Sequence, residues 1–354
     1  MPTVNLATKY SDLLDQRFSQ KSLTEAWCGH DYDWDGTNTI KVWTIGQATI
    51  NDYNAAATGN RFGTPTELGD EVNSYQLRKK RSFTHTLDIT NTQDQQNIKK
   101  ANAVLKQIWD EQMVPEIDQY RLRTWASGAG LVEINSTALS KSNIIEALLS
   151  AHAAMNNRLA PREGRVCFVT ETTAVKCKLA TELQYNEGYT SKAIVNGMVA
   201  KLNNCPIVAV PDQYMPSGVE FLIKYKRATA DPTKLKMLRV HTTPQGYAGA
   251  LLEGLTRYDS FVLAQKANGV YVYAKSGVVE APAGSVSTNK VTLTSTTGSA
   301  VIKYTTDGTN PKTSDTAKVY SAPVDITANT LFRAYASKAG MVDSGITEYQ
   351  AVHT

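Results

Sequence analysis

One amphipathic stretch, residues 90–126, constrains the fold of this chain more than any other segment. Apolar side chains recur there at helical spacing: Ile98, Ala101, Leu105, Ile108 and Trp109. Pro115 removes a backbone donor and disfavours helix at Val114, so the sequence predicts a kink or a restart at that point. We expect a long spine of two helical pieces that ends at the glycine-rich run 127–130. An ordinary core helix would show the same periodicity.

Two β-rich segments precede this spine. Residues 38–54 and 72–89 are rich in β-branched and aromatic side chains, and apolar and polar residues alternate in the second segment. The residues between them contain several glycines and a proline, which predicts a loop. The sequence therefore predicts a long antiparallel ribbon. Because a two-stranded ribbon is marginal in water by itself, we expect another copy of the protein to cover it.

Residues 1–37 are polar with isolated apolar anchors, which predicts an arm that lies on another surface. The aromatic anchors have large apolar areas to bury and favour this interpretation over a partly disordered terminus. A basic run follows in the ribbon, and it fits an acidic neighbour, nucleic acid or, equally, a solvated strand face. The candidates for contacts between subunits are therefore Trp27, Trp34, Trp43, Arg78, Lys79, Lys80 and Arg81.

Helix and strand patterns alternate after the spine and predict a compact α/β region. We expect helices at about 140–159 and 172–183, and strands at 165–170, 206–210, 219–225, 235–242 and 270–274. His152 lies on the apolar face of the first helix, which favours a buried core histidine over a ligand.

The composition and strand pattern of the sequence change after residue 275. Residues 276–285 are typical of a linker, and short Thr-rich strands separated by turn signals follow them. This pattern predicts a small β-sandwich. The segment 276–354 has equal numbers of basic and acidic residues, so the net charge of +4 lies in residues 1–275.

Composition narrows the classes of function. A net charge of only +4 lacks the basic signature of a dedicated nucleic-acid binder. The chain has no apolar run of membrane-spanning length, and its N-terminus lacks the apolar core of a signal peptide, so we expect no membrane association and no export by that route. The four cysteines are widely scattered, which predicts reduced, buried thiols: Cys28, Cys167, Cys177 and Cys205.

The familiar catalytic motifs are missing from the sequence: it has no phosphate-binding loop, no nucleophile elbow and no HExxH. The acidic cluster of Asp31, Asp33 and Asp35 lacks the glycine and terminal glutamate of a calcium loop, which favours a solvated turn over a metal site. Catalytic triads need not be local in the sequence, so the missing motifs alone do not decide the class of protein. We expect a structural protein and not an enzyme, with no catalytic residue, no metal and no cofactor, because the arm, ribbon and spine cannot bury themselves within one chain.

The order of arm, ribbon, kinked helix and α/β region resembles the major capsid protein of tailed bacteriophages, which has the Hong Kong 97-like fold. The run VNSYQLRKKRSFTHTLDIT leads into the helical stretch, whose most characteristic piece is VPEIDQYRL. The resemblance covers about residues 1–275 and implies an α+β fold. Its expected parts are an N-terminal arm at 1–37, an extended β loop at 38–88, a spine helix and peripheral domain at 89–130, an axial α/β domain at 131–245 and a return to the peripheral domain at 246–275.

The resemblance implies a function and partners. It implies self-assembly as hexamers and pentamers into an icosahedral head that encloses double-stranded phage DNA. It also implies non-specific contact with that DNA, a portal and a separate scaffold protein as partners, and no membrane. The expected location is the virion, after assembly in the host bacterial cytoplasm.

Residues 276–354 resemble the immunoglobulin-like domain at the C-terminus of chitobiases. The distinctive run contains Tyr304, Asp307, Gly308, Asn310 and Pro311. In this context the resemblance implies an exterior decoration domain that either binds carbohydrate weakly or only stiffens the lattice. We also expect that its deletion leaves the shell intact, because a linker and an independent strand pattern set it apart.

Two other classes of protein remain as alternatives. One is a bacterial surface or adhesin-like protein, against which the missing export signal speaks. The other is a carbohydrate-active enzyme with an accessory C-terminal domain, which would need two carboxylates flanking a cleft.

Overall fold

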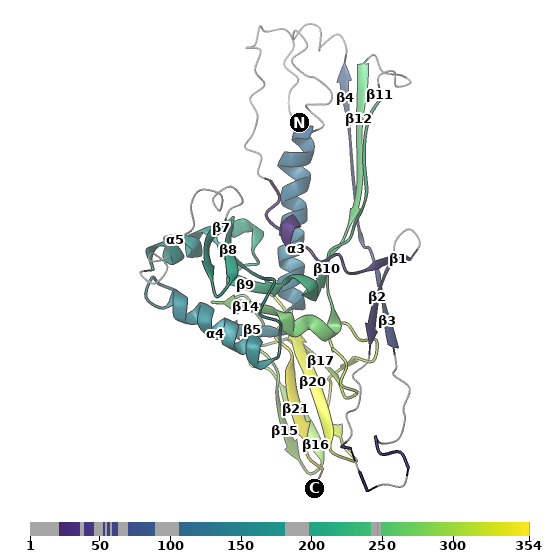
Figure 1. The fold of residues 1–354 in the computed structure, drawn as a ribbon, viewed down its shortest axis with the longest axis vertical. Coiled ribbons are helices and arrows are strands. Elements are labelled where there is room, and N and C mark those ends of the chain that lie inside the picture. The colour runs from purple at the N-terminus through teal and green to yellow at the C-terminus, as the bar shows by residue number, and fades with distance from the viewer. Residues whose placement is uncertain are drawn as a thin grey trace.

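The computed structural model describes residues 21–35, 39–45, 52–53, 55–56, 59–62, 70–88, 106–180, 198–241, 246 and 249–353. The molecule is elongated (Figure 1). A long helix runs beside three strands that extend toward one end, a six-stranded sheet with two helices lies to one side, and a β-sandwich formed by the C-terminal residues occupies the opposite end. The mixed α and β composition predicted from the sequence is confirmed.

The spine is the helix α3, Val114–Gly128, preceded by the π-helical turn η2, Trp109–Met113. Pro115 has no N–H to donate and lies in the first turn of α3, where no donor is needed. The expected kink is therefore absorbed by a wide turn, in which Val114 N donates to the Trp109 carbonyl. The helix ends at Gly128, within the predicted glycine-rich run, whereas residues 90–105 of the predicted spine lie outside the described residues.

A three-stranded antiparallel sheet lies along the spine. It consists of β4 (Lys79–Asp88), β12 (Gly249–Tyr258) and β11 (Thr233–His241), with β12 in the centre. One face packs on the spine through a cluster of apolar side chains: Phe83, Leu238, Tyr258, Trp109, Met113 and Ile117. Gly254 permits this contact, because a Cβ there would lie 2.2 Å from the Phe83 ring.

The ribbon predicted for residues 38–54 and 72–89 is wrong in its second strand. That segment forms two strands in different sheets: β3 (Asp70–Gln76) pairs with β2 (Thr39–Ile45), and β4 pairs with β12. The two strands separate at Arg78, whose backbone N donates to Asp259 Oδ2 at 2.7 Å. The alternating pattern runs through both strands because each has one buried face, so it does not reveal the change of partner. The short strand β1 (Asp33–Asp35) completes the first sheet, which we call the loop sheet, in the order β1-β2-β3.

The six-stranded sheet has the order β5-β14-β9-β6-β8-β7. Its strands are β5 (Leu131–Ile134), β14 (Val270–Ala274), β9 (Val219–Tyr225), β6 (Arg165–Thr170), β8 (Cys205–Val210) and β7 (Met198–Leu202). Helices α4 (Ile144–Asn157) and α5 (Glu171–Leu179) bury one face, and the spine buries the other. Burial on both faces explains the continuous apolar runs of β6 and β8. The predicted strands 165–170, 219–225 and 270–274 are confirmed.

Further predictions about the core are confirmed. His152 is buried on α4, beside the Arg165 guanidinium. All four cysteines are free and buried, and burial raises the pKa of each thiol. Two short strands, β10 (Thr229–Ala230) and β13 (Phe261–Val262), pair where the spine meets the loop sheet.

The C-terminal residues form the predicted sandwich. One sheet contains β15 (Ala283–Ser287), β16 (Lys290–Thr294) and β19 (Val324–Asp325), and the other contains β18 (Lys318–Val319), β17 (Val301–Thr305), β20 (Thr330–Ser337) and β21 (Thr347–Ala351). The predicted linker is wrong at its start. Val278 forms a β-bridge with Val342, and both side chains belong to the core beneath the spine.

Candidate subunit interfaces

The predicted arm, residues 1–37, contains a segment that is bound to the chain's own spine. The Asp118 carboxylate of α3 is 2% exposed and accepts hydrogen bonds from Ser22 Oγ at 2.7 Å, Leu23 N at 2.8 Å and Thr24 Oγ1 at 2.6 Å. These contacts hold the 3-10 turn η1 (Glu25–Trp27) against the helix. The arm therefore has a fixed point after residue 21, and residues 1–20 lie outside the described residues.

A second carboxylate, Asp231, ties this segment to the spine and the six-stranded sheet. Five groups donate to it: Gly29 N (3.1 Å), Thr229 Oγ1 (2.6 Å), Ser260 Oγ (2.5 Å), Trp125 Nε1 (2.9 Å) and Lys224 Nζ (3.3 Å). Burial opposes ionisation of Asp231, but Lys224 and the hydroxyl donors outweigh it and hold the pKa of the carboxyl below its ordinary value. The structure places Trp27 here, against the chain's own core, where its carbonyl accepts from Lys224 Nζ at 3.1 Å.

The loop sheet carries an exposed apolar pair. Trp43 and Val72 lie opposite each other on β2 and β3 and are 60% and 39% exposed. Alternation along the strands puts Asp33 and Asp35 on the same face. The other face is buried, with Ile40 inaccessible to solvent. Trp43 and Val72 thus form a small exposed apolar patch on this face of the loop sheet.

Trp34, the third predicted aromatic contact, lies on the edge strand β1 and is 38% exposed. It makes an edge contact with Tyr32 at 5.8 Å between ring centroids, and Lys234 Nζ lies 4.4 Å from the centre of its ring. Trp34 is thus partly occupied within the subunit, which leaves Trp43 as the more available of the two tryptophans.

The predicted basic run is divided between the two faces of the β4-β12-β11 sheet. Lys79 and Arg81 face the spine, where Lys79 Nζ lies 5.0 Å from the centre of the Tyr120 ring and Arg81 Nε lies 2.6 Å from Glu116 Oε1. Lys80 faces the other way. It lies in one cross-strand row with two further basic residues, Arg257 and Lys234. Like charges directly across neighbouring strands repel, and within the subunit Lys234 of this row contacts the Trp34 ring.

The distinctive run of the C-terminal domain forms a turn and a contact with the rest of the chain. Tyr304 is buried in the sandwich, with its ring centroid 5.6 Å from that of Phe332. Asp307 accepts from the hydroxyls of Thr309 and Thr316, which lower the pKa of its carboxyl to about 2. Gly308 supplies the positive φ of 77° that this turn requires. The run ends in Asn310 and Pro311, both buried; Asn310 Nδ2 donates to the Ala264 carbonyl at 3.0 Å.

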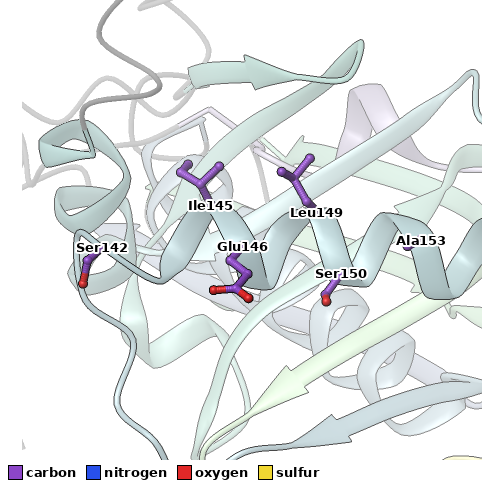
Figure 2. Close-up of a pocket in the computed structure, with 6 residues that line it drawn as sticks. All are labelled: Ser142, Ile145, Glu146, Leu149, Ser150 and Ala153. Carbon is purple, nitrogen blue, oxygen red and sulfur yellow. The ribbon is translucent and has the colours of Figure 1, made fainter.

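A depression of about 620 Å³ lies along one side of α4, and Figure 2 shows the side chains that line it. It is lined by Ser142, Ile145, Glu146, Leu149, Ser150 and Ala153. Glu146 is the one carboxylate in this lining, so the depression lacks the carboxylate pair that glycoside hydrolysis requires. Among the described residues, no helix is long and apolar enough to cross a bilayer.

Comparison with known proteins bears on both parts of the chain. Residues 281–348 match the family described as the chitobiase/beta-hexosaminidase C-terminal domain. No curated protein sequence matches the chain.

Several solved structures share most of the architecture. The structure of Mycobacterium phage Che8 is 16% identical, with a TM-score of 0.59, over 78% of this chain and 97% of that chain. The capsid of the cyanophage P-SCSP1u is 14% identical, with a TM-score of 0.59, over 75% and 92%. The mature capsid of bacteriophage PhiM1 is 11% identical, with a TM-score of 0.56, over 77% and 92%. At these identities the likeness is one of fold. The chain therefore has the Hong Kong 97-like capsid fold, with a C-terminal immunoglobulin-like sandwich that matches the chitobiase/beta-hexosaminidase C-terminal domain family.

Proposed function

We propose that this chain is a major capsid protein, which self-assembles as hexamers and pentamers into the icosahedral head that encloses double-stranded phage DNA. The protein acts as a structural subunit in the virion, after assembly in the host bacterial cytoplasm. The observation that carries the proposal is the exposed face of the loop sheet, where Trp43 lies beside Val72 on a fold shared with phage head structures. Burial of such a face against sister subunits is favourable by about 25 cal/mol for each Å² of apolar surface removed from water.

The partner surface in the neighbouring subunit is the outward face of the β4-β12-β11 sheet. That face presents the basic row at Lys80 and, in the next row, Leu255 opposite Met237. The loop sheet presents apolar Trp43 on the same face as Asp33, Asp35 and Lys41. Lys41 forms an ion pair of 2.8 Å with Asp35, so these three residues together carry one net negative charge. The two faces are complementary in charge and in apolar content, and complementary potentials set the register and specificity of a contact more than its strength.

Three variants test this pairing: two single substitutions and one double substitution. Trp43→Ala should abolish closed particles in negative-stain micrographs and light scattering, while the urea midpoint of the unassembled subunit stays unchanged because the side chain is exposed. Lys80→Glu should also weaken assembly, and Asp33→Lys in the same chain should restore it. A parent protein that stays a compact monomer at high concentration would contradict the proposed function. Particles formed equally well by all variants would contradict only the pairing.

The C-terminal sandwich extends from the end of the molecule (Figure 1), which supports a place for it on the outside of the shell. Protease treatment of intact particles should then cleave within the sandwich before the six-stranded sheet. Non-specific contact with DNA, a portal and a separate scaffold protein complete the proposal, and they rest on the fold likeness. We do not propose carbohydrate binding, because Tyr304 is buried and Asp307 and Asn310 are used within the chain.

A further inference from the structure

The chain passes from the spine helix to the six-stranded sheet through a short junction, residues 127–130. Three carbonyls of this junction accept hydrogen bonds from the C-terminal domain. Lys312 Nζ donates to the Ser127 and Ala129 carbonyls, both at 2.8 Å, and Ile346 N donates to the Gly130 carbonyl at 3.2 Å. The C-terminal domain therefore satisfies backbone carbonyls at the point where the spine helix meets the six-stranded sheet.

The junction itself has few side chains with which to fix its conformation. A Cβ at Gly128 would lie 2.4 Å from Val262 Cγ2, and a Cβ at Gly130 would lie 2.7 Å from the carbonyl carbon of Ala267. Glycine is therefore required for close packing at both positions, and it leaves the backbone conformation weakly specified. The last carbonyls of a helix also lack partners within the helix, and its C-terminal end attracts a cation.

Lys312 is positioned to fix the junction backbone and to place a cation at the end of the spine helix. Asn310 Oδ1 accepts the Lys312 backbone N–H at 2.9 Å, while Asn310 Nδ2 holds the domain to the body at Ala264. The Lys312 ammonium also lies over the ring of Tyr335, with Nζ 5.6 Å from the ring centre. Desolvation lowers the pKa of Lys312 to about 8 against the opposing effect of Asp343, so the ammonium is charged at neutral pH.

The fit extends beyond Lys312. A Cβ at Gly345 would lie 3.1 Å from Val132 N, so the domain approaches the first residues of β5 closely. Val342 packs in the core beneath the spine, and Glu348 forms an ion pair of 3.3 Å with Arg158, directly after α4. The domain thus contacts the end of the spine, the edge strand of the six-stranded sheet and the end of α4.

We infer that the C-terminal domain is a brace that sets the angle between the spine helix and the six-stranded sheet, and that Lys312 is its principal positioning residue. A brace of this kind acts within each subunit, before and independently of any contact between subunits. It gives the domain a structural role in addition to any exposed position on a shell.

Hydrogen exchange on the unassembled subunit tests the brace. In Lys312→Met, the amides of residues 130–134 should exchange about tenfold faster, because one charge-assisted donor to two carbonyls is lost. Lys312→Arg should retain most of the protection. Lys318→Met is the matched control, since Lys318 is exposed on the edge strand β18 of the same domain and should leave the junction unchanged.

A second variant covers the case in which Lys312→Met unfolds the sandwich. Gly345→Ala should push the domain away from Val132 and raise exchange at the junction, while the amides of β17 and β20 stay protected. Unchanged exchange at residues 130–134 in Gly345→Ala and in a folded Lys312→Met would overturn the inference. Because the readout needs no particles, a failed brace and a failed capsid function give different results.

Discussion

Lys224 Nζ lies 3.3 Å from Asp231 Oδ2, and both side chains are completely inaccessible to solvent. The ammonium also lies 3.4 Å from the centre of the Trp125 ring on the spine. One ion pair therefore connects strand β9, the spine helix and, through Gly29 N, the arm. Charges are rarely buried this completely without a pairing partner and further hydrogen bonds, and here the carboxylate has both.

Removal of one member of this pair should be costly. In Lys224→Met the Asp231 carboxylate stays buried without its counter-charge, so we expect the free energy of unfolding to fall by about 3–5 kcal/mol. Urea denaturation of the unassembled subunit measures this change. Lys266→Met, at an exposed lysine on the 3-10 turn η6 (Ala264–Gly269), should stay within about 0.5 kcal/mol of the parent. An equal, small effect of both substitutions would show that the buried pair contributes little.

Asp118 should control the attachment of the arm. In Asp118→Ala, Ser22, Leu23 and Thr24 lose their common acceptor, so we expect faster trypsin cleavage after Lys21 and faster exchange of the Leu23 amide. Limited proteolysis followed by mass spectrometry gives both the rate and the position of cleavage. Asp110→Asn, earlier on the same helical stretch, should leave cleavage at Lys21 unchanged, and faster cleavage there would assign the effect to general loosening of the helix.

His152 should make the subunit sensitive to acid. Burial, with repulsion from Arg165, lowers the pKa of His152 from 6.5 to about 4. As the pH falls, the His152 imidazole therefore takes up a proton near pH 6.5 in the unfolded chain but only near pH 4 in the folded chain. The stability contributed by this residue is fully present above pH 6.5 and is lost as the pH falls toward 4, by on the order of 2 kcal/mol after allowance for partial solvent access.

The comparison of wild type with His152→Gln isolates this term, because other groups titrate equally in both proteins. The unfolding free energy of His152→Gln should fall less between pH 7 and about pH 4.5, whereas that of His353→Gln, at an exposed position, should follow the wild type. Parallel curves for all three proteins would remove His152 as the source of acid sensitivity.

Deletion of residues 276–354 should damage the subunit, contrary to the expectation drawn from the linker-like composition. The deletion removes Val278 and Val342 from the core beneath the spine, and burial of two such side chains contributes roughly 3–6 kcal/mol. We expect fewer particles in micrographs and a lower unfolding midpoint. Val342→Ala should reproduce part of the loss, while Val352→Ala, at a side chain 53% exposed, should not. Normal particles from the truncated chain would restore the interpretation of 276–285 as a simple linker.

Local patterns account for the parts of the fold that were predicted well. The strand at 165–170 has both faces buried, so an unbroken apolar run marks it, and the helix that contains His152 has one buried stripe. The exposed Trp43 could be named from the sequence because an aromatic residue in a predicted ribbon has few partners nearby. The role of Lys312 could not, since its acceptors are backbone carbonyls with no residue-specific signal.

The sequence by itself determined the elements whose burial repeats at a regular interval: the spine, four strands of the six-stranded sheet (β6, β8, β9 and β14) and the C-terminal sandwich. Only the tertiary structure decided that β4 leaves the ribbon to pair with β12, that Asp231 gathers donors from the arm, spine and sheet, and that Lys312 meets the end of the spine helix. The physical reason is the separation along the chain between the groups that interact. Periodicity reports which face of an element is buried, whereas a hydrogen-bond partner distant in the chain leaves no periodic trace at either end.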